Sequence, residues 1–178
     1  PNLIISAPFD EVELRNLMYS AQFTQQPYAI RYPRGTGYQT NWEQPFQMLE
    51  EGKAIVKKEG EKVAVLSTGT IGNAINSLKG SFTHVHFPFV KPLDYKMLKK
   101  VFQNYQVIIT YEEGVVKGGF GHQVMHYAQR ELYKGSLFIQ GYPDTFIEHG
   151  RTEELKEQIG FSKKQIQAFI MKKLASEI

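Results

Sequence analysis

The chain has 178 residues, of which 42% are hydrophobic, and it carries 21 Lys and Arg against 18 Asp and Glu, for a formal net charge of +3. This length and apolar content suit one large or two small globular domains and exclude disorder as the dominant state. The chain has no cysteine, which excludes disulfides, thiolate metal sites and a cysteine nucleophile.

Basic residues alternate with acidic ones throughout the sequence, so the small net charge does not indicate a nucleic-acid partner. No apolar stretch approaches the roughly 18–20 residues that span a bilayer, and the N-terminus lacks the basic region of a signal peptide. The sequence therefore predicts a soluble, cytoplasmic protein that binds neither nucleic acid nor membrane.

Residues 1–35 have the pattern of a strand, a helix and a second strand. An apolar run at residues 2–7 precedes Asp10, a predicted helix N-cap with Glu13 as its capping-box partner. Residues 28–32 form the second strand candidate. Two strands and one helix cannot bury a core alone, so we expect the end of an α/β domain that begins upstream of this chain. The helix is expected to bury a stripe of apolar residues at Leu14, Leu17, Met18 and Ala21.

Residues 36–53 show neither helical nor strand periodicity. Glycine, proline and polar residues are scattered through this stretch, so we expect a linker that crosses the surface. A new alternation of strands and helices beyond it predicts a second folded unit at residues 54–178.

The second unit alternates apolar strands with amphipathic helices. Four strands are predicted, at residues 63–66, 83–87, 107–111 and 137–140. This alternation predicts an α/β fold with a mostly parallel sheet covered by helices on both faces. The expected inward helical stripes are Ile71, Ala74, Ile75 and Leu78; Leu98, Val101 and Phe102 after an Asp94 cap; Val124, Ala128 and Leu132; and Ile166, Phe169, Ile170 and Leu174 after a Ser162–Gln165 capping box.

The glycine-rich loop at residues 112–121 lies between a strand and a helix, where phosphate-binding loops often occur. It lacks the G-x-x-x-x-G-K-[ST] motif, and the carboxylates Glu112 and Glu113 would repel a phosphate. These two residues are adjacent on a strand end and point in opposite directions, which argues against a shared acid/base site. The pattern favours glycines that serve turns and close packing of helix on strand.

Two histidine pairs have a spacing that metal sites use. His122 and His126 are four residues apart on one helix, and His84 and His86 share one strand face. Neither pair has an evident third ligand or partner, so ordinary packed or surface histidines are the favoured interpretation.

The segment 31–35, which reads R-Y-P-R-G, follows a strand and ends on a turn. An arginine there is placed to offer its planar fork to a phosphate or carboxylate at the rim of the sheet. The alternative is a surface arginine that braces the linker. The residues alone support the two roles equally.

Four motifs together resemble the C-terminal third of the 1-deoxy-D-xylulose-5-phosphate synthase family, within the transketolase superfamily. They occur in the family's order and spacing over essentially the whole chain. The motifs are A-I-R-Y-P-R-G at residues 29–35, F-V-K-P-L-D at 89–94, T-Y-E-E with G-G-F-G at 110–113 and 118–121, and P-D-T-F-I-E-H-G at 143–150.

The resemblance implies a thiamine-diphosphate enzyme that condenses pyruvate with glyceraldehyde 3-phosphate to give 1-deoxy-D-xylulose 5-phosphate and CO2, for isoprenoid, thiamine and pyridoxal synthesis. It implies that residues 1–35 end a pyrimidine-binding domain and that 54–178 form a transketolase-like C-terminal domain of a homodimer. The Mg2+ ligands, cofactor-binding residues and catalytic residues of the family would then lie upstream. This chain alone is expected to be inactive and to bind neither thiamine diphosphate nor Mg2+. The one substrate-binding residue that maps here is Arg34, which in the family grips the phosphate of glyceraldehyde 3-phosphate.

The competing hypothesis is a stand-alone, non-catalytic binding or assembly module related to the same C-terminal domain. The incomplete N-terminal unit argues against it, because a module that stands alone would not expose two core strands. A nucleic-acid module ranks third, since no string of basic and aromatic residues such as an RNP motif is present.

Overall fold

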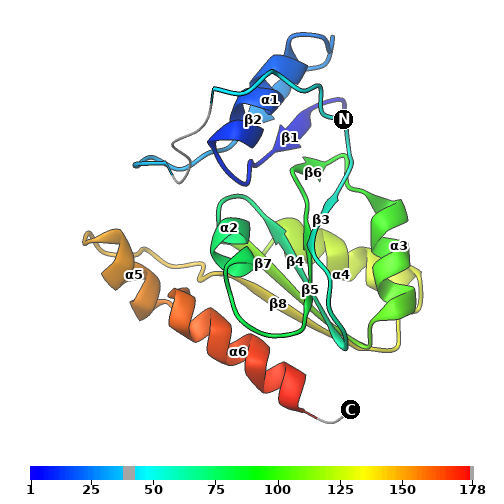
Figure 1. Ribbon diagram of the computed structural model, residues 1–178, viewed down its shortest axis with the longest axis vertical. Helices are drawn as coiled ribbons and strands as arrows, with labels where there is room; N and C mark the ends of the chain where they lie inside the picture. The colour runs from blue at the N-terminus through cyan, green and yellow to red at the C-terminus, as the bar shows by residue number, and fades with distance from the viewer. Residues whose placement is uncertain (38–42, 177–178) are drawn as a thin grey trace.

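The computed structural model describes residues 1–37 and 43–176, which form two sheets with their helices (Figure 1). The larger sheet has the strand order β3-β5-β4-β7-β8. Strands β5, β4, β7 and β8 are parallel to their neighbours, whereas β3 is antiparallel to β5. The predicted mostly parallel sheet is therefore confirmed. The strands are β3 (Ile55–Lys58), β4 (Val63–Thr68), β5 (Thr83–His86), β7 (Val107–Val115) and β8 (Ser136–Tyr142).

Helices cover both faces of this sheet, as predicted. Along β4, Ala64 and Leu66 join one core cluster while Val63 and Val65 join the other, because successive strand residues point to opposite faces. Helices α3 (Tyr95–Asn104) and α4 (Phe120–Arg130) close the first face. Helices α2 (Ile71–Asn76) and α6 (Lys163–Ala175) close the second, and α5 (Thr152–Gln158) precedes α6.

Residues 1–37 form strand β1 (Ile4–Ser6), helix α1 (Glu11–Ala21) and strand β2 (Tyr28–Ile30), as the sequence predicts. Their sheet is completed by β6 (Phe89–Lys91), in the order β2-β1-β6. Strand β1 is parallel to β2 and antiparallel to β6. A small core of Ile4, Leu17 and Phe89 holds the three together. The two parts of the chain thus share one sheet, with α1, β1 and β2 at one end of the larger sheet (Figure 1).

Three local expectations need correction. Strands β3 and β6 were not predicted, because each has only three or four residues and depends on a distant partner. Leu132 is 72% exposed rather than inward, since α4 ends at Arg130 and the backbone turns to a positive φ at Leu132. Met18, expected in the buried stripe of α1, is 55% exposed, whereas Leu17 is fully buried.

The predicted helix caps are largely confirmed. The side chains of Asp10 and Asp94 accept hydrogen bonds from Glu13 N and Met97 N, at 2.9 Å each. Ser162 and Gln165 form the complete capping box. The predicted reciprocal bond at α1, from Asp10 N to the Glu13 side chain, is wrong. The Glu13 carboxylate turns inward and bonds to Phe9 N and His86 instead.

The predicted linker, residues 36–53, includes residues 38–42, which lie outside the described residues. From residue 43 to residue 53 the chain has neither helix nor strand, and it runs along α1. Gln47 N donates to Asn16 Oδ1 at 3.0 Å, and Leu49 N donates to Ser20 Oγ at 2.9 Å. The boundaries placed at residues 35 and 54 stay predictions, and residues 177–178 of the second unit are also outside the description. Among the described helices, none is long and apolar enough to cross a bilayer.

Candidate functional site

Arg34 lies just after β2, on a bend that it forms with Gly35. Gly35 has a φ of +152°, at the edge of a region that L side chains rarely adopt, so a glycine suits this bend. The Arg34 side chain is exposed, and within residues 1–37 and 43–176 it makes no hydrogen bond or ion pair. It can therefore meet a ligand without first breaking a contact to these residues.

Arg31, to which the sequence assigned no role, holds the start of the same segment. Its backbone N donates to Ser6 O at 2.8 Å, which extends the β1–β2 pairing. Its guanidinium and the Glu112 carboxylate flank Gly114, each within 4 Å of the place where a Cβ on that glycine would lie. Burial raises the pKa of Glu112, and the Arg31 charge and two backbone amides oppose this shift. Both arginines are exposed, but the Arg31 guanidinium lies near Glu112, whereas no such partner of Arg34 is found in residues 1–37 and 43–176.

The two adjacent carboxylates occupy two different helix N-termini. Glu112 accepts hydrogen bonds from Phe120 N and Gly121 N at the start of α4, at 2.9 and 2.8 Å. Glu113 accepts from Thr70 Oγ1 and Ile71 N at the start of α2. The prediction that they point apart is confirmed. Because each carboxylate already compensates the positive end of a helix, a phosphate at either end would meet like charge.

The glycines of the loop serve backbone geometry and close packing, as predicted. Gly118 has a φ of +78°. A Cβ at Gly121 would collide with Ile139 Cγ2, and with Thr110 Oγ1 at 2.6 Å. Side chains are therefore excluded where α4 crosses β7 and β8.

His122 and His126 are exposed on α4, and His122 Nδ1 accepts a hydrogen bond from Gly118 N at 3.0 Å. Among the described residues, no group of three or more His, Cys, Asp or Glu side chains is arranged to hold a metal ion. The interpretation of these two as surface histidines is confirmed.

His84 and His86 are completely buried, and the expectation that they lack partners is wrong. His86 Nε2 lies 2.8 Å from Glu13 Oε2, and His86 Nδ1 lies 3.4 Å from Ser67 Oγ. Ser67 Oγ is also 2.8 Å from His84 Nε2, and His84 Nδ1 is 3.4 Å from Asn76 Oδ1. A hydrogen-bonded chain thus runs from α1 through β5 and β4 to α2. Sequence reasoning missed it because Glu13 and His86 are 73 positions apart.

The protons of this chain can be ordered in two ways that satisfy every ring nitrogen. With both imidazoles neutral, His84 donates to Ser67, Ser67 donates to His86, and His86 donates to Glu13, provided that the Asn76 amide is turned to donate to His84. With one more proton, on His86, the Ser67 hydroxyl donates to His84 instead. Burial lowers the pKa of His84 to about 3, so this ring is neutral in both arrangements near pH 7.

Ser67, His86 and Glu13 are the residue types of a hydrolytic triad, but they are not arranged to act as one. Ser67 is 0% exposed and shares its hydroxyl between two imidazoles, so no substrate atom can reach it. Glu13 is stabilised as a carboxylate instead. Burial alone would raise its pKa, but the charge and hydrogen bond of His86, the Phe9 amide at 2.6 Å and the nearby Lys57 together lower it.

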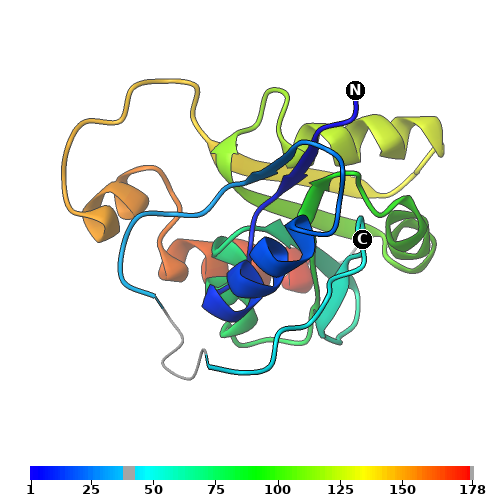
Figure 2. The same cartoon turned by 90° about the horizontal axis from the view of Figure 1, so that it is seen from above.

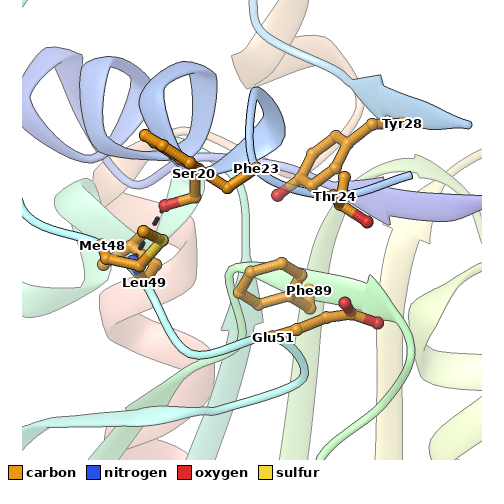
Figure 3. A pocket seen from close by; sticks show the side chains of 8 residues that line it. All are labelled: Ser20, Phe23, Thr24, Tyr28, Met48, Leu49, Glu51 and Phe89. Carbon is orange, nitrogen blue, oxygen red and sulfur yellow. Dashed lines mark hydrogen bonds between the residues drawn. The ribbon is translucent and has the colours of Figure 1, made fainter. Parts of the chain in front are cut away.

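A hollow of about 230 Å³ lies where the end of α1, β6 and residues 48–51 meet (Figure 3). No arginine, lysine or histidine lines it, so it does not suit a phosphorylated ligand. Arg34 lies outside it. The lining residues are Ser20, Phe23, Thr24, Tyr28, Met48, Leu49, Glu51 and Phe89.

The fourth motif, residues 143–150, forms an exposed loop after β8 that swings away from the body of the molecule (Figure 2). Phe146 in this loop has no cover from the described residues. The motifs thus divide into buried packing elements and two exposed ones, the Arg34 bend and this loop.

Comparison with known proteins decides the family. A family model described as "Transketolase, C-terminal domain" matches residues 52–166. The chain belongs to the transketolase C-terminal domain family. The relationship predicted from the motifs is thereby confirmed, and the doubly covered, mostly parallel sheet is the fold of this family.

Curated relatives extend the similarity to the N-terminal residues. The chain is 42% identical over 175 residues to the 1-deoxy-D-xylulose-5-phosphate synthase of Cytophaga hutchinsonii, which covers 93% of this chain. It is 40% identical over 177 residues to the enzyme of the same name from Vibrio parahaemolyticus, which covers 98% of this chain. The chain spans 28% of the length of each relative.

Two solved structures share the fold. "Split gene transketolase, inactive beta4 tetramer" has a TM-score of 0.82 at 24% identity and covers 98% of this chain, which covers 58% of that one. The transketolase of Campylobacter jejuni has a TM-score of 0.60 at 19% identity, with coverages of 97% and 26%. At these identities the likeness shows the fold alone.

The buried His84 predicts a pH-dependent stability. A histidine with a pKa of about 3 when folded and about 6.5 when unfolded binds its proton in the unfolded chain first, so stability is retained above pH 6.5 and lost as the pH falls toward 3. We expect this group to lower the free energy of unfolding by about 2 kcal/mol between pH 7 and pH 5.

His84→Gln, which keeps an acceptor for Ser67, should flatten this pH dependence by the same amount in urea titrations. His126→Gln, on exposed α4, is the control and should leave the slope unchanged; an unchanged slope in His84→Gln would contradict the prediction.

Proposed function

We propose that this chain acts as the C-terminal part of a thiamine-diphosphate-dependent transferase that condenses pyruvate with glyceraldehyde 3-phosphate, giving 1-deoxy-D-xylulose 5-phosphate and CO2. The observation that carries the proposal is the similarity to the synthases of Cytophaga hutchinsonii and Vibrio parahaemolyticus, at 42% and 40% identity over 93% and 98% of the chain. The product would supply isoprenoid, thiamine and pyridoxal synthesis, in a cytoplasmic homodimer.

Arg34 is the residue proposed to bind substrate, through the phosphate of glyceraldehyde 3-phosphate. Its exposure, its position after a strand of a parallel pair, and its lack of an internal partner among the described residues support this role. A guanidinium donates two parallel hydrogen bonds to a phosphate, and these charge-assisted bonds are stronger than neutral ones. Arg31 and Tyr32 receive no such role, since the guanidinium of Arg31 faces Glu112.

Thiamine diphosphate and Mg2+ are the proposed cofactors of the whole protein, but the described residues do not fit them. The helix N-termini beside the glycine-rich loop hold Glu112 and Glu113, and no cluster of metal ligands exists in residues 1–37 and 43–176. We therefore propose that residues outside this chain hold both cofactors, and that this chain contributes the phosphate anchor and a folded C-terminal domain.

A chimera tests the proposal directly. The segment of the Cytophaga hutchinsonii relative that aligns with this chain would be replaced by the 178 residues, and product formation from pyruvate and glyceraldehyde 3-phosphate would be measured. We expect activity within roughly tenfold of that of the relative, because the chain is 42% identical to it over 175 residues and each tenfold corresponds to only about 1.4 kcal/mol of transition-state stabilisation. A folded chimera that makes no product would contradict the proposal and favour the non-catalytic module.

Arg34→Ala in this chimera tests the phosphate anchor. Loss of a bidentate, charge-assisted contact worth about 1.5–3 kcal/mol should lower kcat/KM for glyceraldehyde 3-phosphate roughly tenfold to a hundredfold. Arg34→Lys should recover only part of this loss, because an ammonium lacks the planar fork.

Unphosphorylated glyceraldehyde is the substrate control, and Arg130→Ala, on the exposed end of α4, is the control variant. Neither glyceraldehyde turnover nor the KM for pyruvate should respond to Arg34→Ala. An equal loss with glyceraldehyde and with its phosphate ester would show that Arg34 is a structural brace.

A further inference from the structure

Residues 6–13 run from the end of β1 into the first turn of α1, and besides the β1–β6 pairing they are hydrogen-bonded to the larger half of the chain at three points. Ala7 N donates to Pro88 O at 2.8 Å, and Gly69 N donates to Ala7 O at 3.2 Å. The third point is the 2.8 Å contact between His86 Nε2 and Glu13 Oε2. The position of this short stretch is therefore set by β5 and by the residues that follow β5.

The same stretch also holds both ends of the segment that carries Arg34. Arg31 N donates to Ser6 O at 2.8 Å, which fixes the beginning of the segment. At its other end, Gly37 packs so closely on the Glu11 side chain that a Cβ would overlap the carboxylate. The segment that carries Arg34 is thus held at one end by Ser6 and at the other by Glu11. Both residues are close to Glu13 in sequence, at separations of seven and two residues.

Among these three hydrogen bonds, only the one between Glu13 and His86 depends on side-chain identity. The other two join backbone groups, which any sequence presents. The Glu13 side chain is 7% exposed and His86 is 0% exposed, so a displaced carboxylate would be left buried without its partner. Lys57 Nζ lies 3.9 Å from Glu13 Oε1 and 4.2 Å from the centre of the Phe9 ring, which closes the site from β3.

We propose that Glu13 and His86 form a positioning pair, which fixes the junction of β1 and α1 against β5 and thereby sets the place of the Arg34 bend. The functional part of this proposal rests on the proposed role of Arg34 in binding a phosphorylated substrate. Neither residue touches the substrate. They act through Phe9, whose amide also donates to Glu13, and through the Ser6 carbonyl that receives Arg31.

Amide hydrogen exchange of the 178-residue chain tests the mechanical part without any assay of activity. In Glu13→Gln the contact loses its charge, and we expect the Arg31 amide to exchange about tenfold faster, while Val65 at the centre of β4 is unchanged. Glu153→Gln, on the exposed face of α5, is the matched control. An unchanged Arg31 amide would overturn the proposal, and so would an equal acceleration of Arg31 and Val65, since that would report global destabilisation only.

Two substitutions of His86 keep the test decisive if Glu13→Gln does not fold. His86→Gln retains an N–H that can reach Glu13 and should keep Arg31 exchange within about twofold of the native rate. His86→Leu removes the donor and should accelerate it at least as much as Glu13→Gln does. Equal exchange in the two variants would overturn the proposal.

The functional part is tested in the chimera. Glu13→Gln should raise the KM for glyceraldehyde 3-phosphate about tenfold and leave turnover of glyceraldehyde unchanged, because small misplacements of a binding group are costly. In an Arg34→Ala background the same change should have no further effect. An equal loss with both acceptors would overturn the link to Arg34. A native chimera without activity would instead refute the proposed function, while the exchange experiment would still decide whether the pair positions the bend.

Discussion

A buried carboxylate is tolerated only where hydrogen bonds and an opposite charge compensate it, and Glu13 lies in such a place. It accepts hydrogen bonds from the Phe9 amide and, at 2.8 Å, from a completely buried imidazole. Removing either partner would leave charge or a polar ring uncompensated in the interior. The Glu13–His86 contact therefore favours the placement of α1 in which β1 pairs with β6.

The carboxylates of Glu112, which is buried, and Glu113, which is partly buried, obey the same rule in a different setting. Glu112 and Glu113 are adjacent on β7, yet each bonds to the N-terminus of a different helix. Their negative charge compensates the helix ends and keeps phosphate away from a loop whose glycines would otherwise suggest a phosphate site. Arg34 is exposed on its bend, away from these two helix ends. The two carboxylates thus give the glycine-rich loop a structural role, unlike the bend that is proposed to bind substrate.

Local signals in the sequence predicted most of the fold. The apolar runs of β4 and β7, the stripes of α3 and α6, and the caps at Asp10, Asp94 and Ser162 depend on neighbours within a few residues, so local sequence patterns predicted them. Strands β3 and β6 could not be found in this way, because they are short and antiparallel to strands far away in the chain. The same limit concealed the partner of Glu13: a Glu three residues after an N-cap normally indicates a capping box, and only the tertiary fold brings His86 within reach. For Arg34, the strand and turn signals predicted the exposed bend, whereas its role depends on the resemblance and stays a prediction.

A double-mutant cycle on the free energy of unfolding shows whether Glu13 and His86 are energetically coupled. Urea titrations of the native chain, Glu13→Gln, His86→Leu and the double variant would give the coupling energy. We expect the double variant to lose little more stability than the worse single variant, with a coupling energy of about 1–3 kcal/mol. Losses that add to within about 0.3 kcal/mol would contradict it, since independent residues behave in that way.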